Sequence, residues 1–274
     1  MNPKKREQSQ EEQFRNRDDV IERVFEQHYR PGAKDIPFSM DDIREAIAEV
    51  AKARSGYKEK NVADVRYQYT SGRRSLPESI NKLGPWMIVG RGKAQYAFVK
   101  LVASPEIKLQ EDLLTILLPD ATPEIVLEYA GSDEQGTLAK VHYNRLMDIF
   151  LQLTCYHLQN HWRTSIKNKG QCEIDDLYVG LDIDGKQFVI PVEAKSANDR
   201  LSKTQIVQMI DFARDRYSKL IMRPVGVQEM KDGSLVLIEF TPAGHPDEIK
   251  IKEMRRYKLV PMSEVPLDKQ QSQS

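Results

Sequence analysis

Three carboxylates and a lysine lie within residues 170–197 at spacings that can bring them together. Glu173 and Asp175 are two apart in one apolar run, and Glu193 and Lys195 are two apart in the next. Alternate side chains of a strand share a face, so each pair points the same way if both runs are strands. Carboxylates held together repel each other unless a divalent cation lies between them. Oxygen ligands favour Mg²⁺ or Mn²⁺, which predicts metal-assisted chemistry here.

The two runs that carry these residues have the pattern of a β-hairpin. Residues 172–181 and 187–195 predict strands, and Asp184-Gly185 between them is a strong turn signal. The second run is apolar until Glu193, so the hairpin is expected inside a sheet. Charges at the end of a buried strand then require partners, which favours convergence of the carboxylates and the lysine.

An acid, a hairpin and Glu-x-Lys at the end of an apolar strand resemble the PD-(D/E)xK nuclease superfamily of restriction enzymes and junction resolvases. The resemblance implies that Asp175 and Glu193 bind Mg²⁺, with Mn²⁺ as the alternative metal. It implies that Lys195 orients the attacking water. Glu173 is expected as an alternative ligand or as a group that supports a ligand.

The pattern departs from the superfamily at two points. Ile174 stands where the motif has proline, and Asp176 competes with Asp175 for the position of the first acid. The tripeptide itself is unspecific, because it begins at four glutamates, Glu106, Glu193, Glu229 and Glu248. Only the hairpin context selects the second copy. The alternative interpretation is a solvated hairpin with ordinary surface charges.

Helices are expected on either side of the hairpin. Residues 133–164 predict one long helix, and in the superfamily this helix often supplies a further acid. Glu134 and Asp148 are the candidates, and a surface carboxylate or an ion-paired carboxylate is the alternative for each. After the hairpin, Ser202 can cap a helix that carries Gln205 near the site.

The distribution of charge points to a polyanion partner, although the 274 residues carry no net charge. Residues 52–100 hold eleven lysines and arginines against three acidic residues, whereas residues 105–274 hold 21 basic and 26 acidic residues. A basic segment interleaved with tyrosines favours nucleic acid over a merely solvated surface.

The basic segment follows predicted helices. Residues 18–29 and 39–54 have helical apolar stripes, and Ser39 with Asp42 predicts a capping box for the second. A third helix is expected from Asn61.

Two strand-like runs with a basic turn between them, residues 86–89 and 96–102, complete the plan of a winged helix-turn-helix. The expected partner is double-stranded DNA. The candidates for reading base edges are Lys58, Lys60, Asn61 and Arg66. The candidates for phosphate contacts are Arg73, Arg74, Arg91 and Lys93.

The expected fold class is α/β (α+β), with a restriction-endonuclease-like mixed sheet flanked by helices and an N-terminal winged helix-turn-helix domain. The expected segments are a disordered tail (1–17), a winged-helix-like DNA-binding domain (18–104), a nuclease domain (105–260) and a flexible tail (261–274).

Several other classes are disfavoured. No apolar run reaches the roughly 20 residues that a membrane span needs. Two cysteines and no secretory signal favour a reducing, cytoplasmic location. A zinc site from Cys155, His157, His161 and Cys172 is disfavoured, because on the expected helix Cys155 and His157 do not share a face.

The sequence as a whole resembles a type II restriction endonuclease, part of a restriction system. We therefore expect a magnesium-dependent hydrolase that cuts DNA phosphodiester bonds at a recognised sequence. A homodimer is expected, because cutting both strands takes two sites. The alternatives are a structure-selective repair nuclease or junction resolvase, and a non-catalytic DNA-binding regulator.

Overall fold

The computed structural model of the chain describes residues 3–54, 57–70, 74–110, 112–131, 134–166 and 170–265. The chain forms two compact units. The first comprises residues 1–105 and 165–171, and the second comprises residues 106–164 and 172–274. Each unit has its own hydrophobic core.

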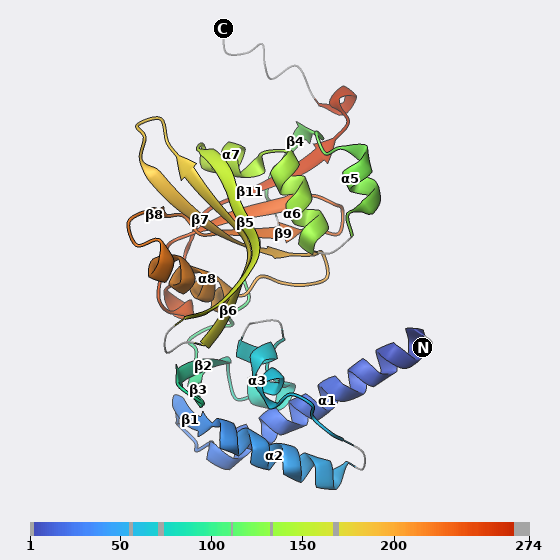
Figure 1. Cartoon of the computed structure of the whole chain (residues 1–274), viewed down its shortest axis with the longest axis vertical. Helices are drawn as coiled ribbons and strands as arrows, with labels where there is room; N and C mark the ends of the chain where they lie inside the picture. Colours follow the sequence, from blue (N-terminus) through green and yellow to red (C-terminus); the bar gives the residue numbers. More distant parts are fainter. Residues whose placement is uncertain are drawn as a thin grey trace. The chain divides into compact units, whose positions relative to one another are not determined.

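The first unit combines helices with a small antiparallel sheet (Figure 1). Its strands are ordered β1-β3-β2, and both pairings are antiparallel. Its elements in chain order are α1 (Pro3–His28), β1 (Asp35–Ser39), α2 (Met40–Ala53), α3 (Val62–Thr70), α4 (Glu78–Asn81), β2 (Trp86–Gly92) and β3 (Gln95–Lys100).

The predicted capping box at the start of α2 is confirmed. The Ser39 hydroxyl accepts hydrogen bonds from the backbone N–H groups of Asp41 and Asp42, and the Asp42 carboxylate accepts one from the Ser39 N–H. The apolar stripe predicted for this helix is confirmed, because Ile43, Ala46 and Val50 are its buried face.

The expected tail at residues 1–17 is wrong for the segment before Asp18, because α1 begins at Pro3. Asn16 and Arg17 are buried. Arg17 Nε donates to Glu59 Oε2 at 2.8 Å, and both side chains are almost fully buried. This ion pair, which is distant in sequence, holds the N-terminal helix against the unit.

The second unit is built on one large sheet (Figure 1). Its strands are β4 (Thr115–Pro119), β5 (Thr154–Ile166), β6 (Gly170–Leu181), β7 (Gln187–Lys195), β8 (Ile221–Met222), β9 (Val225–Glu229), β10 (Leu235–Phe240) and β11 (Ile251–Val260). Its helices are α5 (Glu124–Tyr129), α6 (Glu134–Tyr143), α7 (Leu146–Leu151) and α8 (Lys203–Arg216), with short 3₁₀ turns η1 (Pro246–Glu248) and η2 (Met262–Glu264).

This sheet is mixed, as predicted. Its order is β4-β11-β10-β9-β7-β6-β5, with β8 pairing β7 outside this path. The pairs β6–β7, β9–β10 and β10–β11 are antiparallel, whereas β7–β9 and β4–β11 are parallel. Helices α6 and α7 pack on the face that carries Tyr178, Ile190 and Val192. Alternation along the strands turns Glu193 to the other face, where it meets α8.

The predicted hairpin is confirmed as β6 and β7. Asp176 pairs with Val192 and Leu181 pairs with Gln187. Gly185 in the turn has φ of 77°, a conformation that favours glycine.

The single helix expected for residues 133–164 is wrong. The chain forms α6 and α7 and then continues as the 13-residue strand β5. Arg145 and Gln152, at the two ends of α7, adopt left-handed backbone conformations with φ of 49° and 55°. Arg145 separates α7 from α6, and Gln152 ends α7. In the residues that follow, pairing in the sheet outweighs the local helical periodicity.

Among the described residues, no helix is both long enough and apolar enough to cross a membrane.

Candidate functional site

Lys195 is the centre of a buried polar cluster at the end of β7. Its Nζ donates to Glu193 Oε1 at 2.9 Å and to Glu134 Oε1 at 2.9 Å, and lies 3.0 Å from the Ala194 carbonyl oxygen. Asp175 Oδ2 accepts a hydrogen bond of 2.9 Å from the Ala194 N–H. The structure therefore brings Asp175, Glu193, Lys195 and Glu134 together, as expected from the sequence.

Burial raises the pKa values of two acids of this cluster, Asp175 and Glu193. Burial and the neighbouring Asp175 carboxylate raise the pKa of Glu193 to about 8. Burial also raises the pKa of Asp175, while Lys195 opposes the shift. Burial alone would lower the pKa of Lys195, but Glu193, Asp175 and Glu134 hold it above its ordinary value. A further positive charge would relieve the repulsion between the two acids.

Helix α8 contributes Gln205 to the cluster. Ser202 caps this helix by accepting a hydrogen bond from the Thr204 N–H, which fixes the helix start. Gln205 Nε2 donates to Glu193 Oε1. Gln205 Oε1 is buried and has no hydrogen-bond partner among the described residues. The side chain that contacts the Glu193 carboxylate thus also carries an acceptor oxygen without a partner among the described residues.

Gln228 on β9 was not identified from the sequence. It is 1% exposed and pairs with Lys195 in the sheet. Its Nε2 lies 2.8 Å from the Ser196 carbonyl and 3.0 Å from that of Asp199, and its Oε1 accepts from the Leu201 N–H. It therefore fixes the loop between Lys195 and α8. The only sequence signal was a polar residue inside an apolar strand.

Asp176 points away from this cluster. Its Oδ1 lies 2.6 Å from His157 Nε2 and accepts a hydrogen bond from the Leu177 N–H. Burial raises the pKa of Asp176, and His157 opposes the shift. Of the two candidates for the first acid, the geometry therefore joins Asp175 alone to Lys195.

Two further candidate acids have other partners. Glu173 Oε1 lies 3.0 Å from Arg163 Nε, and its side chain is 10% exposed. Asp148 accepts from Arg145 and from the Cys155 N–H. The structure does not bring Asp148 to Lys195, because α7 is a separate helix from the one that carries Glu134.

Some of the candidate DNA contacts are exposed, and others already contact residues of the first unit. Lys58, Lys60 and Lys93 are exposed. Asn61 is exposed, but its side chain accepts from the Ala63 N–H and donates to Asp64 Oδ1. Asn61 is therefore committed to the start of α3.

Three of the candidate arginines are engaged within the first unit, and Arg73 lies outside the described residues. Arg66 is buried over the Tyr96 ring, 4.6 Å from its centroid, so it is not available to read a base edge in this conformation. Arg74 pairs with Asp18 and Arg91 with Asp35.

Asp18 and Asp35, the acidic partners of Arg74 and Arg91, precede residues 52–100, in which the basic excess was counted. Over residues 1–105 the balance is 20 basic against 15 acidic residues. The excess that reaches the surface is thus smaller than the local count of residues 52–100 indicates.

The described residues contain no group of three or more His, Cys, Asp or Glu side chains that could hold a metal ion by themselves. Cys155 and His157 lie on a strand and not on the expected helix, so their side chains do share a face. Both line one cavity, but the described side chains supply no third ligand there.

Comparisons with protein families, with curated proteins and with solved structures found no match to this chain.

Proposed function

We propose that the chain is a metal-dependent DNA endonuclease with its active site at Asp175, Glu193, Lys195 and Glu134. The observation that carries the proposal is the position of the Lys195 ammonium group. This group is buried and contacts carboxylates from β7 and α6, with Asp175 held beside it by the Ala194 N–H. Perturbed ionisable groups gathered in this way are typical of catalytic sites.

The donor set fits Mg²⁺ or Mn²⁺. Asp175 and Glu193 offer carboxylate oxygens, and Gln205 offers the unpartnered Oε1. All three are oxygen donors, which these ions prefer. When bound, such an ion lowers the pKa of a coordinated water and neutralises charge on the phosphate.

Lys195 has the donors to act on the attacking water and on the phosphate. An ammonium group has three N–H bonds, and a substrate would compete with Glu134 and Glu193 for them. Lys195 then holds the water in line with the P–O3′ bond. The water oxygen bonds to phosphorus as that bond breaks, and the proton of the water passes to solvent. The departing O3′ takes a proton from solvent, which leaves a 5′-phosphate and a 3′-hydroxyl.

The first unit supplies the DNA contacts in this proposal. Its order of helix, strand, three helices and hairpin supports a winged helix-turn-helix. Lys58 and Lys60 precede α3, and Lys93 lies in the turn of the β2–β3 hairpin. A homodimer would supply the two active sites needed to cut both strands of a recognised sequence.

The test is cleavage of plasmid and genomic DNA with Mg²⁺ by wild type, Lys195→Met and Asp175→Asn. Lys186→Met and Asp184→Asn are matched controls in the exposed turn of the hairpin. We expect discrete fragments from the wild type and both controls, and loss of cleavage in the two site variants although they stay folded.

Other outcomes identify the alternatives. Preferential cutting of branched DNA would replace sequence recognition by recognition of DNA structure. Retained binding without cleavage of methylated, unmethylated or branched DNA would overturn the nuclease proposal in favour of a regulator.

A further inference from the structure

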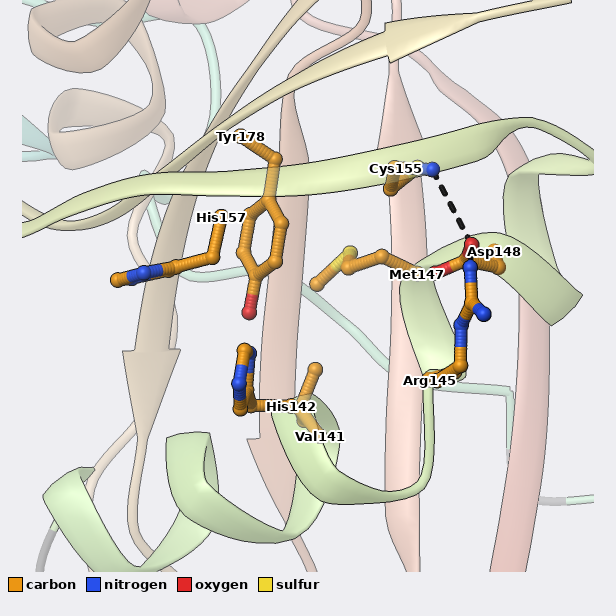
Figure 2. A pocket seen from close by; sticks show the side chains of 8 residues that line it. All are labelled: Val141, His142, Arg145, Met147, Asp148, Cys155, His157 and Tyr178. Carbon is orange, nitrogen blue, oxygen red and sulfur yellow. Dashed lines mark hydrogen bonds and ion pairs between the residues drawn. The ribbon is translucent and has the colours of Figure 1, made fainter.

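Strand β5 carries two histidines with different surroundings. His157 lines a cavity of about 220 Å³ beside Tyr178 and His142 (Figure 2), and its Nε2 lies 2.6 Å from Asp176 Oδ1. This contact accounts for the position of the His157 ring. The side chain of His161 is 44% exposed, and its Nδ1 lies 3.8 Å from the nearest oxygen of a glutamate on β6, which is too long for a hydrogen bond.

The backbone of His161 is unusual for a residue inside a strand. Its φ is 46°, in the left-handed region that is unfavourable for residues with a Cβ. The other described non-glycine residues with positive φ, which are Ala94, Arg145 and Gln152, lie in a turn or at the ends of a helix. β5 is the last strand in the order of the sheet. An irregularity at a sheet edge turns a side chain in a new direction, and strained residues gather at binding and catalytic sites.

Arg163 and Glu173 join His161 at this edge of the sheet. Glu173 Oε1 lies 3.0 Å from Arg163 Nε and 3.8 Å from His161 Nδ1. The glutamate is nearly buried, whereas the Arg163 side chain is 63% exposed. One carboxylate therefore holds two basic side chains next to each other, and both of them reach solvent.

Trp162, which lies between the two basic residues in the sequence, anchors this part of β5 to α8. Its ring packs against that of Phe212, with 5.2 Å between the centroids. The guanidinium carbon of Arg216 lies 5.2 Å from the centroid of the Trp162 ring, and Arg216 also donates to Thr164 Oγ1 at 3.0 Å. The basic pair is therefore presented by a strand whose position is fixed.

The basic pair lies beside the Lys195 cluster. Burial raises the pKa of Asp175, and Lys195 and His161 are among the groups that oppose this shift. His161 is thus within electrostatic reach of a carboxylate proposed to bind the metal. Asp175 and Lys195 are themselves buried, so a phosphate that reaches them passes the exposed side chains around the cluster. Since carboxylates repel a phosphate, basic groups at that position favour its approach.

We propose that His161 and Arg163 bind phosphates of the DNA strand next to the scissile bond, and that Glu173 positions both side chains. This inference rests on the proposed nuclease function and adds strand contacts from the second unit to those of the first. An imidazole offers an N–H donor, and a guanidinium offers a fork of donors that matches phosphate oxygens. Phosphate contacts fix the position of the strand and do not read its sequence.

The first test is DNA binding by the full-length protein carrying Lys195→Met, in which the proposed cleavage cannot proceed. Fluorescence anisotropy follows a labelled duplex of mixed sequence in Mg²⁺ over a range of salt concentrations. We expect His161→Ala and Arg163→Gln each to weaken binding about tenfold. Arg163→Gln should also reduce the slope of log affinity against log salt by about 1, whereas Arg163→Lys keeps the charge and should keep the slope.

Matched control residues lie elsewhere in the second unit. His245 is similarly exposed, with its Nδ1 3.6 Å from Asp247, and the exposed Arg255 pairs with Glu253 on β11. His245→Ala and Arg255→Gln should bind DNA as tightly as the parent protein. Unchanged affinity in folded His161→Ala and Arg163→Gln would overturn the inference, and so would equal losses in the two control variants.

Cleavage by proteins that retain Lys195 separates this inference from the nuclease proposal. The plasmid concentration that gives half the maximal single-turnover rate should rise about tenfold in His161→Ala and Arg163→Gln, and this rise should exceed the change in the maximal rate. Weaker binding by the two variants of a protein that never cleaves DNA would keep the strand contact and remove the nuclease function. Cleavage by the wild type that both variants match in affinity and rate would keep the nuclease function and remove the strand contact.

Discussion

The Nζ of Lys195 donates a hydrogen bond of 2.9 Å to Glu134, a residue 61 positions earlier in the chain. This contact joins the start of α6 to the end of β7. It adds a residue of α6 to a site otherwise formed by β6, β7 and α8, and gives Glu134 a specific role as a partner of the lysine.

Glu134→Gln should weaken DNA cleavage without unfolding the protein. The glutamate side chain is 37% exposed, and Lys195 keeps Glu193 as its second partner. We expect a loss of roughly 10-fold to 100-fold in cleavage rate, because the position of the lysine becomes less defined. Single-turnover cleavage measures this, and Glu128→Gln on the exposed side of α5 is the control. Equal rates for the two variants would remove Glu134 from the site.

Asp175→Asn and Asp176→Asn should have opposite effects. Asp175→Asn is expected to abolish Mg²⁺-dependent cleavage, because this carboxylate lies beside Ala194 and Lys195. Asp176→Asn is expected to keep cleavage but to lower the melting temperature, because it disrupts a buried contact with His157. Cleavage assays and thermal unfolding on the same preparations separate the two, and loss of activity only in Asp176→Asn would reverse the assignment.

The raised pKa of Glu193 predicts a fall in stability with pH when divalent metal is removed. The pKa is about 8 in the folded protein and about 4.3 in an unfolded chain. Between these values the folded protein holds a proton that the unfolded chain has lost, so its free energy of unfolding falls as pH rises.

Glu193→Gln should weaken this dependence. In EDTA its melting temperature is expected to drop less than that of the wild type between about pH 5 and pH 8. Added Mg²⁺ should stabilise the wild type at the upper end, because it favours the ionised carboxylate. Parallel curves for wild type and variant would show that Glu193 does not titrate in this range.

Gln228→Leu should destabilise the second unit. The variant leaves the buried Leu201 N–H and the Ser196 and Asp199 carbonyls without their side-chain partner. The expected cost is about 2 to 4 kcal/mol of unfolding free energy. Denaturant unfolding measures it, with Gln187→Leu at the exposed start of β7 as the control. A cost below about 0.5 kcal/mol would mean that the loop does not depend on Gln228.

The exposed lysines and the buried arginine of the first unit should differ in their effect on DNA binding. Lys58→Ala, Lys60→Ala and Lys93→Ala are each expected to reduce the slope of log affinity against log salt by about 1. Lys231→Ala, an exposed lysine of the second unit, should leave the slope unchanged. Arg66→Ala should instead lower thermal stability, because the guanidinium is buried over Tyr96. An unchanged slope in the three lysine variants would exclude them as phosphate contacts.

The sequence by itself determined the local features of this protein. The period-two alternation and the Asp-Gly turn predicted β6 and β7, and Ser39 with Asp42 predicted the start of α2. These signals are carried by residues within a few positions of one another, where backbone preference and side-chain capping act directly. The same alternation placed Asp175 with Glu193 and Lys195.

The tertiary structure decided what depends on distant partners. Residues 154–164 have a helical pattern but form a strand, because sheet pairing outweighs a weak local preference. The sequence predicted that Arg66 and Arg74 contact DNA. In the folded chain Arg66 packs over Tyr96, and Arg74 pairs with Asp18. Asp176 contacts His157, and this contact shows that Asp175 and not Asp176 belongs to the Lys195 cluster. Gln228 has a structural role only because the folded chain brings the loop after Lys195 to it. A sequence gives the charge and shape of each side chain, but its partner is fixed only when the chain folds.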